Sequence, residues 1–467
     1  MNWNAALAAE GACNEHTMKL VKPQTAATEH EPAPSAQPLP MLPDRRKAPR
    51  TWETPPAPVP QPHLDDYRTI IGAAEIDELR FLAREPKGKT VKMVNSTAVG
   101  GGVAEMLNRL VPLLGELEVT THWDVITGGN DFFEVTKAFH NALHGSEYQL
   151  SRAAQEVFLA YNEQNRQRMQ FTEDMVVIHD PQPAALIGSK IGSKKESPAR
   201  WVWRCHIDLS NPNPQVWGFL RPFIEQYDAA IFSSQSFARE LPIPQYLFYP
   251  CIDPLSEKNK ELDESFVQKV CDEFGIDRSR PVVTQVSRFD RLKDPVGVVQ
   301  AFKLARKYVD CQLVLAGGGA SDDPEGALVL KEVRETAGDD RDIIILDLPP
   351  WCALEINALQ RASTIVVQKS IKEGFGLTVT EALWKGKPTI AGAVGGIPNQ
   401  VIHKLTGMLV HSVEGCAYQI RYLLTHPEFA VQLGRNGREH VKENFLITTN
   451  VRRWLLLRRI LLQERAG

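Results

Sequence analysis

The chain alternates between short apolar runs and longer amphipathic stretches for most of its length. Runs rich in valine and isoleucine and bounded by glycine or polar loops are typical of buried parallel strands, whereas apolar residues at every third or fourth position favour helices. The apolar runs are residues 90–95, 118–126, 175–178, 201–205, 229–232, 281–286, 312–316, 343–346, 364–368 and 389–391. Strands that alternate with helices in this way predict α/β units with parallel, doubly wound sheets.

Breaks in this alternation divide the chain into four parts. Residues 1–64 hold 12 of the 32 prolines and show no strand or helix pattern, so we expect a disordered tail, with a docking segment as the alternative. Two α/β units follow, over residues 65–250 and 251–440. The last part, residues 441–467, contains a basic amphipathic helix that either packs on the protein or lies on a membrane surface.

Two glutamates stand close together after the apolar run 364–368. Glu373 lies in a glycine-flanked loop, and Glu381 lies on the helix pattern that follows, about two turns further on. Gly374 and Gly376 allow backbone N–H groups to approach a ligand, and the amino end of a helix favours anionic groups such as phosphate. The arrangement predicts a site for a sugar linked to a nucleoside diphosphate. A strand–loop–helix corner with two solvated glutamates is the alternative.

The sequence around these glutamates is specific enough to resemble a known family. Residues 373–377 read Glu-Gly-Phe-Gly-Leu, a second glutamate follows eight positions after the first, and Gly-Gly-Ile-Pro follows at residues 395–398. This order resembles the C-terminal domain of the retaining GT-B glycosyltransferases of family 4. The resemblance implies that Glu373 is catalytic and that the donor is bound by Gly374, Phe375, Gly376, Leu377 and Glu381.

A cationic stretch follows the apolar run 281–286. Arg288 and Lys293 match the arginine and the lysine with which this family grips the donor diphosphate, so the resemblance implies that both are catalytic. Cations suit that role because negative charge builds up on the leaving diphosphate as the glycosidic bond breaks. Solvated surface charge is the alternative reading of two such residues in a loop.

Glycines follow two further strand patterns. Gly100 to Gly102 come after the first apolar run, but Glu105 stands where a dinucleotide fingerprint has its third glycine, which argues against a nicotinamide site. In the family this loop approaches the donor, so Gly101 and Gly102 are candidate donor contacts. Gly317 to Gly319 lack the Gly-Lys-Ser/Thr ending of a P-loop, and predict either a close approach to the nucleotide or a plain turn.

Two histidines end successive strand patterns of the first α/β unit, each near an aspartate. Ligands of doubly wound sheets bind beyond the carboxyl ends of the strands, which favours a functional role over the structural role that a single histidine more often has. His179 matches the family histidine that approaches the transferred sugar near its 6-hydroxyl, so we expect it to be catalytic. The candidate acceptor contacts are Asp180, Gln182, His206 and Asp208.

Metal and cofactor chemistry is not indicated by the pattern of ligand-type residues. No third ligand accompanies the His-x-Asp spacing at His206, so we expect no metal site. Asp340-Arg341-Asp342 has the spacing of metal-dependent GT-A transferases, but it precedes a strand in a different architecture, and we interpret it as a polar turn. We expect no tightly bound cofactor.

The first α/β unit narrows the resemblance. Residues 131–145 resemble the Phe-Phe-x-x-Thr-Lys-x-x-His-Asn stretch of the glycosyltransferring trehalose synthases, and the resemblance covers about residues 65–450. It implies the GT-B fold, in which two Rossmann-like doubly wound domains, first acceptor and then donor, face a cleft and a C-terminal helix crosses back to the N-domain.

The same resemblance implies a reaction. Glucose would be transferred reversibly, with retention, from NDP-glucose (ADP- or UDP-glucose) to free glucose to form α,α-trehalose. Trehalose phosphorylases, which use glucose 1-phosphate, and GT-B-fold epimerases of nucleotide sugars are the alternatives.

Composition bears on location and partners. A net charge of −4 argues against nucleic-acid binding, and no apolar run approaches the ~18–20 residues of a membrane span. The seven cysteines are odd in number and scattered, as expected for reduced thiols, and the N-terminus has no signal-peptide core. We therefore expect a cytoplasmic enzyme that binds small-molecule substrates, neither nucleic acid nor an integral membrane partner, with a homodimer left open.

Overall fold

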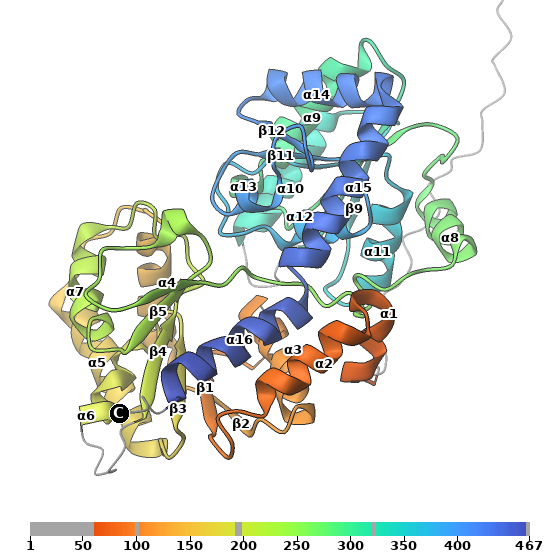
Figure 1. Ribbon diagram of the computed structural model, residues 1–467. Helices are drawn as coiled ribbons and strands as arrows, with labels where there is room; N and C mark the ends of the chain where they lie inside the picture. Colours follow the sequence, from red (N-terminus) through yellow and green to blue (C-terminus); the bar gives the residue numbers. More distant parts are fainter. Residues whose placement is uncertain (1–59, 99–101, 192–198, 319–323, 464–467) are drawn as a thin grey trace, which may run out of the picture. The chain divides into compact units, whose positions relative to one another are not determined.

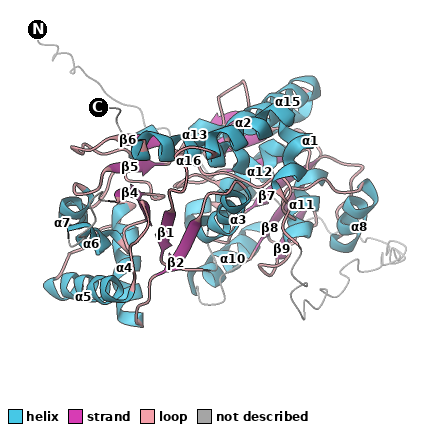
Figure 2. Cartoon of the chain, turned by 60° about the horizontal axis from the view of Figure 1, so that its bottom comes forward, coloured by secondary structure: helices cyan, strands magenta, loops and turns pink. Residues whose placement is uncertain are grey.

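The computed structural model describes residues 60–98, 102–191, 199–318 and 324–463. The part of the predicted tail before Pro60 and the predicted donor contact Gly101 lie outside these ranges. Within them, twelve strands form two six-stranded parallel sheets, one in each half of the chain (Figure 1, Figure 2). The prediction of two parallel α/β units is therefore confirmed.

The predicted motifs lie where the order of the strands reverses in each sheet. The first sheet has the order β2 (Thr121–Val125), β1 (Val91–Asn95), β3 (Met175–His179), β4 (Arg200–Arg204), β5 (Ala229–Phe232), β6 (Gln245–Leu247). The second has the order β12 (Met408–Val410), β11 (Thr389–Gly392), β10 (Ile365–Gln368), β7 (Val282–Val286), β8 (Gln312–Gly317), β9 (Ile343–Asp347). The order reverses between β1 and β3 and between β7 and β10, and such switch points are where doubly wound sheets bind ligands. The sequence analysis did not predict β6 and β12, which have three residues each and are too short to show a pattern.

Helices cover both faces of each sheet. Those of the first half are α1 (Arg68–Ile71), α2 (Ala73–Ala83), α3 (Gly102–Glu116), α4 (Asn130–Leu143), α5 (Arg152–Arg168), α6 (Gly188–Ile191) and α7 (Pro214–Ile224). Those of the second half are α8 (Glu264–Phe274), α9 (Pro295–Arg306), α10 (Pro324–Ala337), α11 (Ala353–Ala362), α12 (Leu377–Trp384), α13 (Ile397–Gln400), α14 (Val413–Thr425) and α15 (Pro427–Asn444), and α16 (Ile447–Leu462) closes the chain. Short 3₁₀ turns lie at Leu64–Tyr67, Ala184–Ile187, Gln235–Phe237 and Arg291–Lys293.

Side chains of the first sheet alternate between two apolar cores. On β3, Val177 belongs to the core that contains α3 and α16, whereas Ile178 belongs to the core that contains α4, α5 and α7. Neighbouring strands follow the same alternation, with Val202 in the former core and Trp203 in the latter. A strand buried on both faces reads as a continuous apolar run, which is why these strands could be located in the sequence.

The C-terminal helix α16 packs on the first half of the chain. Val451, Trp454 and Leu455 are buried in the same core as residues of α2 and α3, and Figure 1 shows α16 beside both helices. The guanidinium of Arg458, 3% exposed, donates hydrogen bonds to backbone carbonyls that include Ala83 and Lys89. The predicted crossing back of this helix is confirmed, and its apolar face is covered by protein. No helix in the described part of the chain is both long and apolar enough to span a membrane.

The chain passes between its two halves at two points that are hydrogen-bonded to each other. The N–H of Ile252 donates to the carbonyl of Phe445, and the N–H of Ile447 donates to the carbonyl of Ile252, both at 2.9 Å. The first of these points lies beside the boundary between residues 250 and 251 that the sequence pattern indicates. These two hydrogen bonds hold the start of α16 against the loop that enters the second half.

Contacts with the first half extend back to Gln61, within the residues assigned to the tail. Leu64, placed at the end of a disordered tail, is only 3% exposed, and its N–H donates to a carboxylate oxygen of Glu116 at 2.7 Å. Arg109 on α3 donates to the side chain of Gln61 and to the carbonyl of Pro62. The pattern of prolines could not show this, because the partners lie on a helix about 50 residues away.

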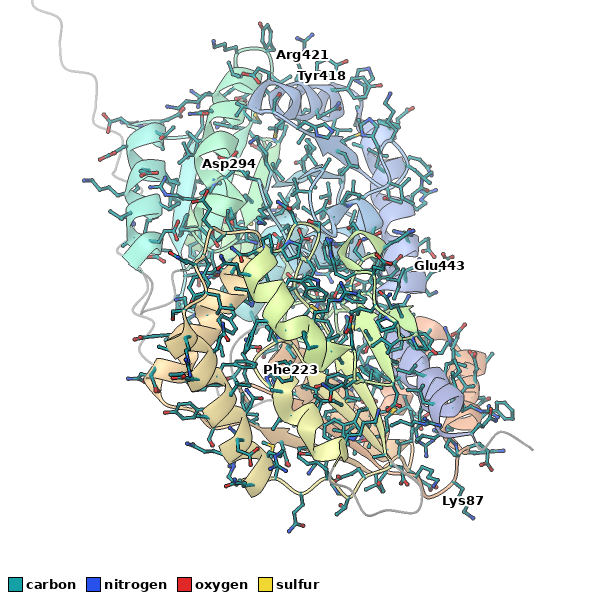
Figure 3. All side chains as sticks on the ribbon, turned by 90° about the vertical axis from the view of Figure 1, so that its left-hand side faces the viewer. Lys87, Phe223, Asp294, Tyr418, Arg421 and Glu443 are labelled. Carbon is teal, nitrogen blue, oxygen red and sulfur yellow. The ribbon has the colours of Figure 1, made fainter. Side chains whose placement is uncertain are left out.

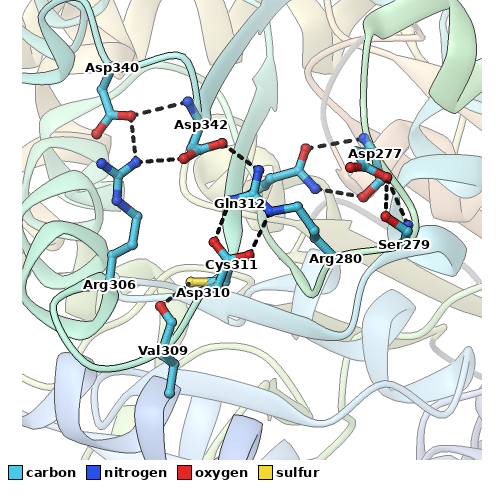
Figure 4. A network of polar contacts seen from close by, with 10 residues as sticks. All are labelled: Asp277, Ser279, Arg280, Arg306, Val309, Asp310, Cys311, Gln312, Asp340 and Asp342. Atoms are coloured by element: carbon cyan, nitrogen blue, oxygen red, sulfur yellow. Dashed lines mark hydrogen bonds and ion pairs between the residues drawn. The ribbon is translucent and has the colours of Figure 1, made fainter.

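The Asp-x-Asp sequence lies in an ion-pair network at the amino end of the second sheet (Figure 4). Arg280 pairs with Asp310 and Asp342, and Arg306 pairs with Asp340 and Asp342, at N···O distances of 2.5 to 3.0 Å. Both carboxylates of the sequence are engaged by arginines and precede β9 in a turn. The interpretation as a polar turn is consistent with this network, which lies at the edge of the sheet opposite the ligand-binding edge.

Candidate active site

The cationic stretch and the first glutamate meet at the switch point of the second sheet. Lys293 follows β7, Glu373 follows the neighbouring β10, and their Nζ and Oε2 atoms lie 2.6 Å apart. Their side chains are 19% and 11% exposed. The hydroxyl of Ser370 donates to the same carboxylate oxygen at 3.2 Å, and the N–H of Ile371 donates to the carbonyl of Leu292 at 2.8 Å. Side-chain and backbone bonds therefore join two loops that are 80 residues apart in the sequence.

Arg288 occupies a more open position than Lys293. Its side chain is 58% exposed, and its guanidinium lies 3.2 Å from a carboxylate oxygen of Asp290. Asp294, which is labelled in Figure 3, caps α9 by accepting from the N–H of Gly297 and also pairs with Lys369. The loop after β7 is thus held by several local contacts, with Lys293 on its inner side and Arg288 at its rim.

Glycines let the two glycine-rich loops of the second half approach each other. A Cβ atom on Gly395 would lie 1.6 Å from the carbonyl oxygen of Glu373, so no other residue fits there without movement. Gly376 starts α12 with φ +85°, a left-handed conformation that favours glycine. The ring of Phe375 points into the core, where it packs against Tyr249 and Phe445 at centroid distances of 6.3 and 5.6 Å. Any contact of this residue with a ligand must therefore come from its backbone.

Glu381 lies on α12 and is buried, with 6% exposure. Burial raises the pKa of its carboxyl group and lowers the pKa of the Lys385 ammonium one turn later, while each charge opposes the other's shift. Lys385 donates to the side-chain oxygen of Asn259 at 3.1 Å. Lys258, beside Asn259, pairs with Glu105 on α3 at 3.0 Å. The second glutamate is therefore connected to the segment that joins the two halves.

The two histidines of the first half form a pair. His179 Nδ1 lies 3.0 Å from His206 Nε2, and the rings are stacked with centroids 5.3 Å apart. Burial lowers the pKa of His179 to about 3 and that of His206 well below its usual value, and the positive charge of Arg204 adds to both effects. His179 is 0% exposed, whereas His206 is partly exposed. The pair is uncharged at neutral pH, and only His206 reaches the surface.

The remaining predicted acceptor contacts lie in the same corner. Asp180 has φ +65°, accepts the N–H of His206 at 2.8 Å, and has its pKa raised to about 6 by burial. Asp208 is 5% exposed and accepts the N–H of Ser210 at 2.8 Å. Gln182 is partly exposed, with one side-chain oxygen that is buried and has no partner among the described residues.

Residues of the predicted donor motif touch residues of the first half. A Cβ atom on Gly374 would lie 3.9 Å from the carbonyl oxygen of His206, and one on Gly102 would lie 3.6 Å from the side chain of Leu377. The side-chain N–H of Asn399 donates to the hydroxyl of Ser234 at 3.0 Å. These contacts bring the predicted donor residues and the histidine corner to one place in the folded chain.

Three residues of this region were not singled out by sequence reasoning. Arg204 lies under the histidine pair, 1% exposed, and donates to the Ser233 hydroxyl and the Phe248 carbonyl. Lys372 directly precedes Glu373, and His144 is the next-to-last residue of the stretch 131–145 that carried the trehalose synthase resemblance. The position next to a motif was the available signal for both. No cluster of three or more metal-ligating side chains occurs among the described residues.

Comparison with known proteins identifies the family. A family model described as "Trehalose synthase, N-terminal domain" matches residues 93–239, and one described as "Glycosyl transferases group 1" matches residues 268–440. The trehalose synthase of Thermococcus litoralis is 45% identical over 398 residues, which cover 84% of this chain and 95% of that protein. The chain belongs to the trehalose synthase family.

Two further matches of this trehalose synthase family member are more distant. A trehalose phosphorylase of Pleurotus pulmonarius is 30% identical over 453 residues, covering 84% of this chain and 60% of that protein. The solved structure of an α,α-trehalose-phosphate synthase (UDP-forming) from Burkholderia xenovorans matches 80% of this chain and 100% of that chain, with a TM-score of 0.63 and 13% identity, which shows the fold alone. The fold is GT-B, and the protein is a hexosyltransferase of trehalose metabolism.

Proposed function

We propose that the protein transfers glucose from a nucleoside diphosphate glucose to free glucose, with retention, to form α,α-trehalose. The observation that supports this most directly is the pairing of Lys293 with Glu373 at the switch point of the second sheet, 2.6 Å apart. A cation and a carboxylate at this place suit a donor that carries a diphosphate next to a sugar with free hydroxyls.

In the proposed reaction, the bond between the sugar and the diphosphate lengthens first, and positive charge develops on the sugar ring. Lys293, with Arg288 and the backbone N–H groups of Gly376 and Leu377, stabilises the leaving diphosphate. The acceptor hydroxyl attacks from the same face and passes its proton to a departing phosphate oxygen. Glu373 orients the donor sugar. A double displacement with a carboxylate nucleophile is the competing route, for which no residue of the first half stands out.

The two remaining roles follow from the position of Glu381 and from the different exposure of the two histidines. Glu381 holds the ribose hydroxyls of the donor, since its carboxylate lies on α12 beyond the loop that contains Glu373. Of the two paired histidines, His206 is partly exposed, and we assign the contact with the sugar to it. His179 is 0% exposed, and we assign a positioning role to it. A hydrogen bond from one ring to the other fixes which nitrogen of His206 carries the proton.

The test is to mix the protein with each NDP-glucose and glucose, and to identify the disaccharide and its anomeric configuration. We expect α,α-trehalose, with turnover that exceeds turnover of glucose 1-phosphate by a wide margin. A single phosphate leaves Glu381 without a ribose to hold. Faster use of glucose 1-phosphate would move the assignment to trehalose phosphorylase, and a rearranged nucleotide sugar formed without glucose would indicate an epimerase.

A further inference from the structure

The carboxyl end of α4 lies against the donor motif. The rings of His140 and His144, one turn apart, have centroids 4.8 Å apart. Gly145 follows with φ +92°, and a Cβ atom there would lie 2.8 Å from the carbonyl oxygen of Asn211 and 3.4 Å from Nζ of Lys372. The backbone next to His144 thus contacts the residue that precedes Glu373. No role in the proposed reaction has so far been assigned to this turn of helix.

His144 is uncharged at neutral pH although charged groups surround it. Burial, the largest effect, lowers its pKa to about 4; the nearby His140, Lys372 and Lys293 lower it further, and Asp208 opposes them. A neutral imidazole has one N–H donor and one nitrogen acceptor. Within the described ranges of the chain, neither ring nitrogen of His144 has a hydrogen-bond partner, and the residue is partly exposed. The side chain therefore retains a donor and an acceptor for a ligand.

We propose that His144 binds the acceptor sugar and, together with Asp208 and Lys372, selects a hexose without a phosphate group. This inference rests on the proposed function and extends it to the acceptor. A sugar hydroxyl both donates and accepts, as a neutral imidazole does, while the carboxylate accepts from hydroxyls and the ammonium donates to them. Each of these three groups comes from a different part of the chain, and the proposed donor contacts Arg288, Gly376 and Glu381 are not among them.

Charge explains the selection against a phosphorylated acceptor. The single charges of Asp208 and Lys372 cancel, and Lys293 is already paired with Glu373. A sugar phosphate would bring about two negative charges close to Asp208, and of the two lysines whose charge acts on His144 only Lys372 would be left to receive them. A like charge placed against a carboxylate is an effective way to reject a competing ligand.

The test compares His144→Ala with His144→Gln, which keeps an uncharged donor and acceptor. For His144→Ala we expect the KM for glucose to rise roughly tenfold or more, because a hydrogen-bonding site that loses its partner discriminates strongly, with the KM for NDP-glucose within about twofold of wild type. His144→Gln should recover most of the loss. His426→Ala, at an exposed histidine between α14 and α15 of the second half, is the matched control and should behave as wild type.

Two further readouts separate binding of the acceptor from a structural role. The slow hydrolysis of NDP-glucose without glucose should fall by a much smaller factor in His144→Ala than trehalose formation at low glucose, because water replaces the acceptor there. The preference for glucose over glucose 6-phosphate should fall at least several-fold in Asp208→Asn, which removes the negative charge that opposes the phosphate. If the His144→Ala variant does not fold, His144→Phe replaces it, because phenylalanine keeps a ring without the nitrogens. The same changes in KM are then expected for His144→Phe.

An equal rise of both KM values, or a loss that glutamine does not recover, would overturn the inference and leave His144 as a packing residue. Failure of the proposed function looks different. Wild-type protein would then form no trehalose from glucose with any NDP-glucose. If wild type does form trehalose and the KM for glucose is unchanged in His144→Ala, only the inference about the acceptor fails.

Discussion

The two sheets of this enzyme present different chemistry at corresponding places. At the switch point of the second sheet, the side chains are ionised and paired, as in Lys293 with Glu373. At the switch point of the first, they are buried imidazoles whose pKa values lie far below the usual range, as for His179. In the proposed reaction the ionised residues meet a diphosphate, whereas the uncharged donors and acceptors suit hydroxyl groups. Under that proposal, one fold serves two kinds of ligand through the residues at its strand ends.

The largest effects are expected for substitutions of Lys293 and Arg288, which test whether these cations act on the leaving diphosphate. Lys293→Ala should lower kcat/KM by roughly 10³-fold and Arg288→Ala by roughly 10²-fold, the scale of losing one electrostatic contact in the transition state. The larger loss is expected for Lys293→Ala because the side chain of Lys293 is 19% exposed, whereas that of Arg288 is 58% exposed. Steady-state kinetics provide the measurement.

Arg291 offers a matched control for both substitutions. It lies in the same 3₁₀ turn as Lys293 but pairs with Glu332 on α10, at 2.6 Å. Arg291→Ala should keep kcat/KM within about twofold of wild type. Equal losses in all three variants would mean that the loop as a whole, and not the placement of Lys293, is what matters.

A smaller effect distinguishes the two glutamates of the second half. Glu381→Gln should mainly raise the KM for the donor, because its proposed partner is the ribose, which does not react. Glu373→Gln should lower kcat as well, because its partner is the sugar that distorts in the transition state. The two roles would have to be abandoned if both variants changed only the KM for the donor.

The first half can be tested through the pH dependence of stability. His144, with a pKa of about 4, His179, with about 3, and His206 all titrate below the ~6.5 of an unfolded histidine. The unfolded chain therefore takes up more protons as pH falls below ~6.5, and the free energy of unfolding decreases. The pKa of Asp180, raised to about 6, acts in the opposite direction between about pH 4 and 6, but it is one carboxyl group against four histidines, since burial also lowers the pKa of His140. We expect a lower Tm at pH 5 than at pH 7.

The contribution of the histidine pair can be isolated with variants. In His179→Asn the difference in Tm between pH 7 and pH 5 should shrink, because one buried group that resists protonation is gone. His426→Gln, at an exposed position, should leave the difference as it is in wild type. An unchanged pH dependence in His179→Asn would show that the pair is not the source of the acid sensitivity.

The smallest effect concerns the start of the first half. A chain that begins at Pro60 should keep its activity within about twofold, because the sequence before it is too rich in proline and polar residues to form a core. A chain that begins at Leu64 loses the contacts of Arg109 with Gln61 and Pro62, and should melt a few degrees lower. Thermal melts and the trehalose assay measure both. Lost activity in the first of these chains, with its Tm unchanged, would place the tail in the site.

The fold and the donor motif could be predicted because their signals are local. Strands buried on both faces appear as apolar runs, and the residues from Glu373 to Glu381 carry a glycine loop and a helix start within nine positions. The short strands β6 and β12 were not found, because three residues show no periodicity. The contacts of Gln61 and Pro62 were not found either, because a partner on a distant helix leaves no trace in the segment itself.

By itself, the sequence determined the two α/β units, the donor motif and the kinds of residue at each strand end, since these depend on spacing along the backbone. Only the tertiary structure decided which residues face one another. The ring of Trp454 on α16 lies 6.3 Å from the ring of His179, centroid to centroid, and His179 is 0% exposed whereas His206 is partly exposed. Likewise, the charge of Lys372 acts on His144 only because Gly145, at the end of α4, lies against a loop more than 200 residues further along the chain. Burial and charge around a side chain come from such long-range contacts, and they set its pKa and its access to ligands.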